Sequence, residues 1–144
     1  MAYGLLGLLV LCLLDCAASS ASIPHGATPL AMSAWNCAEK EPHTFYREDV
    51  REDRARYAEV RAHEEMHKVQ MKRYGCSGWN HAYSTSAQFR EDAESEAFCA
   101  MARRAVEARR MSFAQALDHY AIWLSGSTYD GDYAYSVQRI LRFC

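Results

Sequence analysis

The residues of this chain best suited to chemistry are two histidines four positions apart, in the stretch His63-Glu64-Glu65-Met66-His67. On an α-helix four residues make just over one turn, so both imidazoles project from the same face and can bind one metal ion. Glu64 then lies within reach of a water molecule on that metal and can act as its general base. The spacing therefore predicts a hydrolytic metal centre.

The motif lies in the middle of a segment that we expect to be one long helix. From about Phe45 to Tyr74 the chain has no Pro or Gly, and apolar residues recur with both histidines at helical spacing. Gly75 follows as a typical C-cap. A helix of this length would hold the two histidines on one rigid face.

The rest of the chain predicts further helices. Capping signals and apolar periodicity predict three of them, from the capping box Thr85-Ser86-Ala87-Gln88 to about Arg110, from the capping box at Ser112 to Gly126, and from Tyr133 to Phe143. Residues Gly75 to Ser86 have the composition of a loop. We therefore expect a mainly α fold, with room for a minor β hairpin in the loops.

A catalytic metal of this kind takes three protein ligands, so one more must come from elsewhere in the chain. Gln70 and Arg73 occupy the positions where metzincins carry a Gly and a third His, which excludes that arrangement. The second predicted helix offers three acidic side chains: Glu91, Glu94 and Glu96. Glu94 lies nearest the centre of that helix's apolar stripe, where a carboxylate needs a partner such as a metal ion. His81, in the predicted loop, is a less suitable alternative.

The segment Glu94-Ser95-Glu96-Ala97 resembles the E-x-x-A pattern that follows H-E-x-x-H in small gluzincin-type metallopeptidases, over roughly His63 to Ala100. The resemblance implies a small zincin-like helical domain with packed metal-binding helices and one zinc ion per chain. It also implies His63, His67 and Glu94 as ligands, and Glu64 as the general base that hydrolyses a peptide or protein substrate. The sequence reveals no upstream edge strand for that substrate, and it does not specify what is cut.

Hydrolysis also needs a hydrogen-bond donor for the oxyanion or the substrate. The candidates are His and Tyr side chains outside the motif: His81, His119, Tyr129, Tyr133 and Tyr135. The sequence does not single out one of them, because aromatic residues at helical spacing are usually core and a lone His usually lies on the surface.

Two alternatives to an active peptidase stay open at this point. One is a catalytically inactive zincin-like protein, and the other is a metal-free secreted helical binding protein in which the histidines are incidental. A ferritin-like di-iron centre is excluded, because it needs a second Glu-x-x-His pair and the sequence has only the pair Glu64 and His67.

Length and charge bound the remaining choices. A chain of 144 residues, half of them apolar, with a net charge of −2 fits one small domain, which we expect to be a monomer. There is no basic excess for binding nucleic acid, and no segment after the N-terminus is long enough to span a bilayer. We therefore expect no nucleic-acid partner and no membrane association of the mature form.

The N-terminus has the pattern of an export signal. Leu5 to Leu14 is almost purely apolar and gives way to a run of small residues that reaches Ala21. We expect a secretory signal peptide over residues 1–21, an extended leader over 22–36 and the zincin-like domain over 37–144, in a secreted or periplasmic protein. Lipoprotein anchoring at Cys16 is disfavoured, because Asp15 stands where that signal needs a small residue.

Export also determines how the cysteines are interpreted. If Cys12 and Cys16 leave with the signal, four cysteines remain: Cys37, Cys76, Cys99 and Cys144. An even number in an oxidising compartment predicts two disulfides. The sequence does not choose among the three connectivities, but each should tie the ends of the domain to its helical middle.

Overall fold

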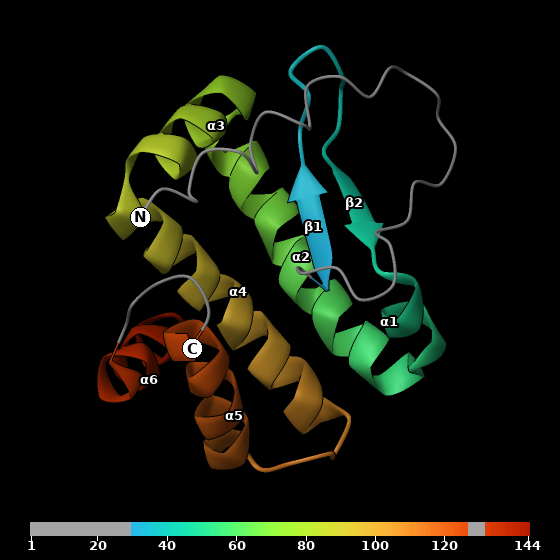
Figure 1. Ribbon diagram of the computed structural model, residues 1–144, viewed down its shortest axis with the longest axis vertical. Helices are drawn as coiled ribbons and strands as arrows, with labels where there is room; N and C mark the ends of the chain where they lie inside the picture. Colours follow the sequence, from blue (N-terminus) through green and yellow to red (C-terminus); the bar gives the residue numbers. More distant parts are fainter. Residues whose placement is uncertain (1–29, 127–131) are drawn as a thin grey trace, which may run out of the picture.

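The computed structural model describes residues 30–126 and 132–144, and these residues are mainly helical (Figure 1). The helices are α1 Glu48–Glu52, α2 Arg54–Tyr74, α3 Cys76–Thr85, α4 Ala87–Glu107, α5 Phe113–Gly126 and α6 Tyr133–Phe143, and two strands precede them, β1 Ala31–Ala34 and β2 His43–Tyr46. The prediction of a mainly α fold with a minor β hairpin is confirmed. The proposed signal peptide and Tyr129 lie outside the described residues.

The two strands pair antiparallel and pack on α2. Ala31 lies opposite Tyr46 and Ser33 opposite Thr44, and these four side chains share one face because side chains alternate along a strand. Ala31 and Tyr46 are buried. The Ser33 hydroxyl lies 2.9 Å from that of Thr44 and donates to the main-chain carbonyl of Glu64 at 3.2 Å. The hairpin is therefore fixed against α2 at the metal motif.

The structure corrects two boundaries on the N-terminal side of the motif. β1 lies within residues 22–36, so the folded domain begins before Cys37 rather than at it. The long helix expected from Phe45 begins only at Arg54. Phe45 belongs to β2, and the helical segment that follows is interrupted at Asp53, between α1 and α2. The Asp53 side chain accepts two backbone N–H groups of α2, and such an N-cap starts a new helix inside an otherwise continuous helical pattern.

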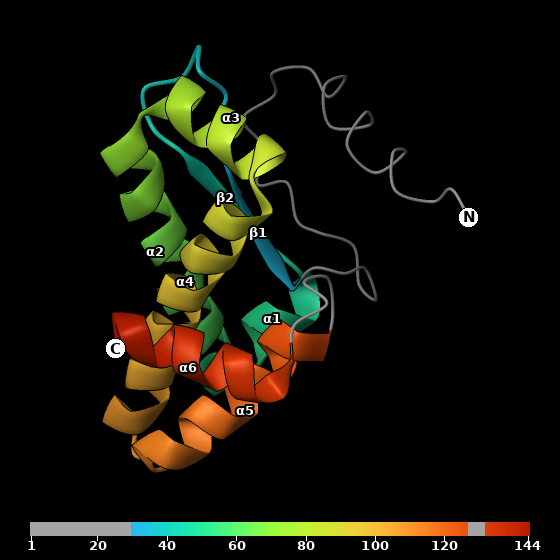
Figure 2. The same ribbon diagram turned by 90° about the vertical axis from the view of Figure 1, so that its left-hand side faces the viewer.

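Helices α2 and α4 form the central antiparallel pair, joined at one end by α3 (Figure 1). α5 and α6 pack on α4 and on each other (Figure 2). The main core lies among these helices and includes two fully buried alanines of α4, Ala102 and Ala105. Their short side chains let neighbouring helices approach α4 closely.

The segment expected to be a loop between the long helices is instead helix α3. Gly78 and the Ser/Thr cluster weaken its helical signal in the sequence, but Trp79 is buried against α2 and α4. A disulfide between Cys37 and Cys76 fixes the start of α3 to the hairpin loop. Burial of one aromatic side chain and this cross-link account for a helix that local propensity does not predict.

The two expected disulfides are confirmed, and their connectivity is now defined. Cys37 pairs with Cys76, and Cys99 of α4 pairs with Cys144 after α6. The Cα–Cα distances of 5.5 and 5.4 Å are normal for such bonds. The first bond ties the hairpin loop to α3, and the second ties the C-terminus to α4, which carries Glu94. Two such bonds agree with an oxidising environment.

The helix ends differ in detail from those expected. The capping box at Ser112 is confirmed, because the side chains and backbone amides of Ser112 and Gln115 bond reciprocally. The N-cap of α4 is Ser86 rather than Thr85, whose hydroxyl donates to the preceding turn of α3. α4 ends at Glu107, before the expected Arg110. The chain leaves the helix direction just after it, with a positive φ of 54° at Arg109.

Candidate metal centre

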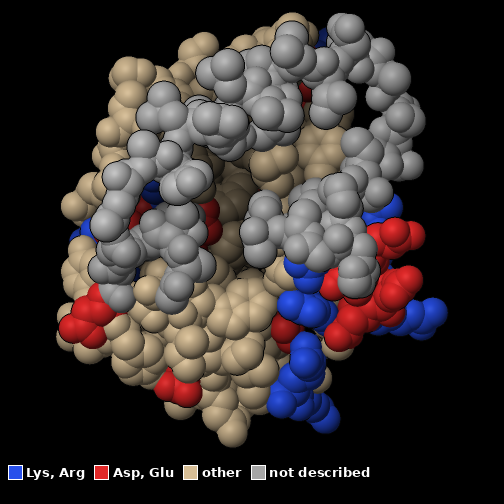
Figure 3. Space-filling view, viewed as in Figure 1, with Lys and Arg blue, Asp and Glu red and all other residues tan. Residues whose placement is uncertain are grey.

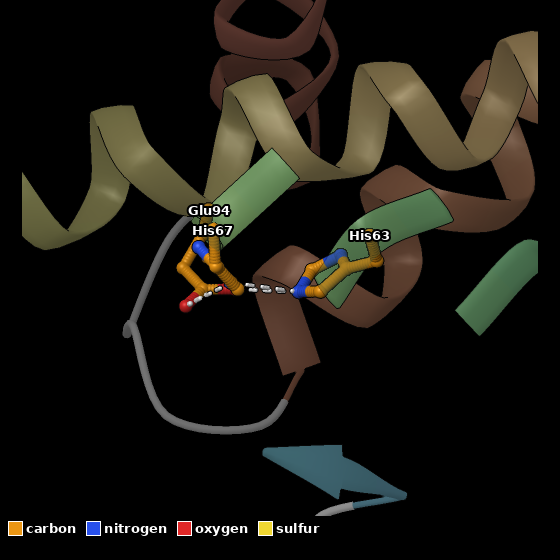
Figure 4. Close-up of side chains that lie close together, drawn as sticks. All are labelled: His63, His67 and Glu94. Atoms are coloured by element: carbon orange, nitrogen blue, oxygen red, sulfur yellow. Dashed lines mark hydrogen bonds and ion pairs between the residues drawn. The ribbon is translucent and has the colours of Figure 1, made fainter. Parts of the chain in front are cut away.

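His63 and His67 of α2 meet Glu94 of α4 in one cluster between the two long helices (Figure 4). Nε2 of His63 lies 3.1 Å from Nε2 of His67 and 3.3 Å from Oε2 of Glu94. Nε2 of His67 lies 3.4 Å from Oε1 of Glu94. The histidines are one turn apart on α2, and the neighbouring α4 presents the carboxylate to both.

The spacing of these atoms matches a metal site. In a tetrahedral site with bonds of about 2.0–2.1 Å, two ligand atoms lie about 3.3–3.4 Å apart. The three separations of 3.1, 3.3 and 3.4 Å are close to that value. The 3.3 and 3.4 Å separations involve the two different oxygens of Glu94, and with one atom taken from each residue the three ligand atoms all lie within 4.8 Å of one another. Two imidazole nitrogens and the carboxylate of Glu94 can therefore hold a metal ion and leave a further coordination position open.

Burial and ion pairing shift the pKa values of His67 and Glu94 in opposite directions. Burial lowers the pKa of His67, but the adjacent Glu94 carboxylate outweighs it and raises that pKa to about 9. Burial raises the pKa of Glu94, whereas the two histidines hold it well below its usual range. His67 and Glu94 therefore form an ion pair in the metal-free protein, and a metal ion would displace the proton of His67.

The second nitrogen of each imidazole has a different environment. Nδ1 of His67 lies 2.8 Å from the side-chain oxygen of Gln70, which is itself almost fully buried. The His63 ring packs edge-on against Phe98, with ring centroids 4.8 Å apart. Nδ1 of His63 is buried and has no hydrogen-bond partner among the described residues. Side-chain bonding thus orients His67, and packing orients His63.

Glu64 lies beside the cluster with one carboxylate oxygen unpaired. Its side chain is buried, and Oε2 has no hydrogen-bond partner in the part of the chain that the structure describes. Its negative charge also contributes to the raised pKa of His67. A buried carboxylate oxygen without a donor is costly unless it has a function. Beside an open metal position, it suits a group that takes a proton from water.

The other candidate ligands are engaged elsewhere. Glu91 forms an ion pair with the buried Arg139 of α6, at 2.5 Å. Glu96 accepts hydrogen bonds from Gln70 and Arg73. His81 is exposed on α3. The structure brings Glu94 to the two histidines and directs Glu91, Glu96 and His81 away from them.

The proposed oxyanion or substrate contacts that are described do not join the cluster. His119 is exposed on α5, where its ring lies edge-on to that of Tyr120 and tilted against that of Trp123. Tyr133 is exposed and donates a hydrogen bond to Asp118. The Tyr135 ring lies under the guanidinium of Arg139.

Tyr83 is a further side chain at the site, and the sequence did not predict its role. Its hydroxyl donates to Oε1 of Glu94 at 2.5 Å, and its ring stacks on Trp79 with centroids 5.0 Å apart. Trp79 and Tyr83 are four residues apart on α3, so both face the α2–α4 pair. That spacing was the available signal, but it has meaning only once the segment is known to be helical.

The surface on the side shown in Figure 1 is hollowed near its middle, and that hollow carries few charged side chains (Figure 3). Charges of both signs gather instead over α1 and the start of α2 (Figure 3). In this group Lys and Arg side chains lie close to Asp and Glu side chains (Figure 3).

No family model, curated protein or solved structure matches this chain. Its function is therefore inferred from the geometry and chemistry of the cluster itself.

Proposed function

We propose that this chain is a zinc-dependent metallopeptidase of the gluzincin type. The observation that carries the proposal is the meeting of His63, His67 and Glu94 at separations of 3.1–3.4 Å. Imidazole and carboxylate ligands with an open position are typical of catalytic zinc. The unpaired carboxylate oxygen of Glu64 beside them supplies the general base that such a centre requires.

In this proposal each residue has a defined task. When bound, zinc supplies Lewis acidity that polarises a carbonyl and lowers the pKa of water towards about 7. Glu64 accepts the proton of the attacking water at its free oxygen and passes it to the leaving amine. Glu94 neutralises part of the charge at the centre, and Tyr83 holds the orientation of its carboxylate.

A peptide substrate is supported by the position of β1. In the described residues β1 pairs only with β2, so its other edge has backbone groups with no strand partner. Because Ser33 contacts the backbone of Glu64, that strand lies beside the motif. An extended peptide can add to such an edge through main-chain hydrogen bonds. β1 is therefore our candidate for the upstream edge strand that the sequence did not reveal.

We also propose that the chain is exported by its N-terminal segment and acts outside the cytoplasm. The two disulfides are stable in an oxidising environment. None of the helices in the described ranges is long and apolar enough to cross a membrane. Removal of residues 1–21 would leave the four paired cysteines and release Cys12 and Cys16 with the signal.

The test is the Glu64→Gln variant. We expect it to bind zinc as the wild type does but to lose at least about 100-fold in hydrolysis of fluorescently labelled casein, because the amide cannot accept the proton. The matched control is Glu65→Gln, since Glu65 is exposed on the same helix and pairs only with Lys68 in the described contacts. That control should keep both zinc and activity.

Other outcomes would select the alternatives. Equal activity of Glu64→Gln and the wild type would remove Glu64 from the mechanism. A wild-type protein that binds zinc but cleaves no casein or peptide-library substrate would favour an inactive zincin-like binding protein. A metal-free wild type would favour the helical binding protein, in which the His67–Glu94 ion pair is purely structural.

A further inference from the structure

Gln70 connects the metal cluster to a polar network that runs along one side of α2. It is only 1 % exposed. Its amide nitrogen lies 2.9 Å from the carbonyl oxygen of Ala93 and 2.9 Å from Oε2 of Glu96. Its side-chain oxygen lies 2.8 Å from Nδ1 of His67. All three bonds join α2 to α4 or to the cluster.

These contacts fix the orientation of the amide. The carbonyl of Ala93 and the carboxylate of Glu96 are acceptors only, so both must receive hydrogens from the amide nitrogen of Gln70. A flipped amide would set its oxygen against two acceptors. The side-chain oxygen of Gln70 therefore faces His67, and Nδ1 of His67 must be the nitrogen that donates to it.

Arg73 holds the far end of the network. Its guanidinium donates to both carboxylate oxygens of Glu96, at 3.1 and 3.2 Å. Such a two-point contact restricts rotation of the carboxylate. Arg73 thus holds Glu96, Glu96 helps to orient Gln70, and Gln70 orients the imidazole of His67.

We propose that Gln70 is a positioning residue that keeps the hydrogen of His67 on Nδ1 and leaves the lone pair of Nε2 directed at the metal. The inference rests on the zinc site proposed above and deepens it. Metal-binding histidines almost always make such a bond on the other ring nitrogen, and its loss typically costs about 10–100-fold in metal affinity. Glu96 has a supporting role in this network rather than the role of an alternative metal ligand.

The experiment compares zinc affinities, by competition with a chromophoric chelator, in the full set of variants. Gln70→Leu should bind zinc about 10–100-fold more weakly than the wild type. Glu96→Ala, at a partly exposed position, keeps Gln70 but removes one of the acceptors that hold its amide. Its zinc affinity should fall by a smaller factor than that of Gln70→Leu. Glu65→Gln, on the exposed side of the same helix, should leave zinc affinity unchanged.

A second measurement separates positioning from a merely structural role. In the protein loaded with cobalt(II), the ring N–H protons of histidine ligands give shifted, exchangeable NMR signals. The wild type should show one slowly exchanging N–H signal from His67, because that proton is buried and bonded to Gln70. Gln70→Leu should lose the protection of this signal while its circular dichroism spectrum stays that of the folded protein.

The outcomes are distinguishable. Wild-type affinity in both Gln70→Leu and Glu96→Ala, with the protected signal retained, would overturn the role of Gln70 and leave the zinc site intact. If Gln70→Leu does not fold, unchanged affinity and an unchanged signal in Glu96→Ala would overturn it. A wild type that binds neither zinc nor cobalt would overturn the proposed function and this inference together.

Discussion

Glu94 contacts three side chains that come from two different helices. His63 and His67 approach its two oxygens from α2, and Tyr83 of α3 donates to one of them. This arrangement explains how a carboxylate that is 7 % exposed stays ionised. It also means that a residue outside the ligand set can alter the geometry of the metal site.

Replacing Tyr83 with Phe tests that dependence. The variant removes one hydroxyl and leaves Glu94 oriented only by the histidines, so we expect zinc affinity to fall by about 10-fold or more. Chelator competition measures the change. Tyr135→Phe is the matched control, because Tyr135 is exposed and lies against Arg139 rather than at the cluster. Equal affinities in the wild type and both variants would show that Tyr83 does not support the ligand.

At the scale of single residues, the sequence predicted the side chains that share a helix face. Spacing alone placed His63 and His67 together, and the apolar stripe of the next helix directed Glu94 rather than Glu91 or Glu96 towards them. Tyr83 and Gln70 could not be assigned in this way. Tyr83 reaches Glu94 only because α3 is folded back, and the role of Gln70 depends on a carbonyl of another helix.

At the scale of elements, small residues set the distance between α2 and α4. Ala93 belongs to one buried cluster with Met71 of α2, and Ala100 lines a shared pocket with Ala62 and Met66 of α2. Ala97 falls between these two alanines on the same face of α4 and is fully buried. The two helices that carry the three candidate ligands therefore meet along a stripe of alanines.

We expect Ala97→Leu to move the two helices apart. Overpacking of this kind should lower the free energy of unfolding by about 1–3 kcal/mol and should also weaken zinc binding, because His63 and His67 are on one helix and Glu94 on the other. Urea unfolding and zinc competition measure the two effects. Ala114→Leu, at an exposed position of α5, should change neither. Unchanged zinc affinity in a destabilised Ala97→Leu variant would contradict this link.

The long helices were predicted because their periodic patterns extend over many residues, whereas short elements depend on contacts distant in sequence. α3 forms although its composition is that of a loop, because Trp79 is buried and Cys76 is cross-linked to Cys37. The hairpin has strands of four residues, too short for alternation to stand out. Asp53 divides a predicted helix because its side chain caps the N-terminus of α2.

At the scale of the whole molecule, each disulfide closes a large part of the chain around the α2–α4 pair. Cys37 and Cys76 are separated by 39 positions, and Cys99 and Cys144 by 45. Cross-links of this span reduce the conformational freedom of the unfolded chain, which benefits a small domain with a limited core. The connectivity required the structure, because four cysteines allow three pairings.

Removing the C-terminal disulfide should destabilise the fold without removing the metal site. For a loop of this length, the chain-entropy model predicts that the double variant Cys99→Ser and Cys144→Ser loses about 4 kcal/mol in the free energy of unfolding. Urea unfolding under non-reducing conditions measures this loss. The folded fraction should still bind zinc, since neither cysteine contacts the cluster in the described interactions. Wild-type stability in the double variant would contradict the expected contribution of the bond.

The central claim is that His63, His67 and Glu94 together hold one zinc ion, and elemental analysis of the purified protein tests it most directly. After equilibration with zinc and removal of the free ion, we predict close to one zinc per chain in the wild type and almost none in His67→Ala. His119→Ala, at an exposed position outside the cluster, should keep one. A folded wild-type protein that retains no zinc, or a His67→Ala variant that retains a full equivalent, would contradict the claim.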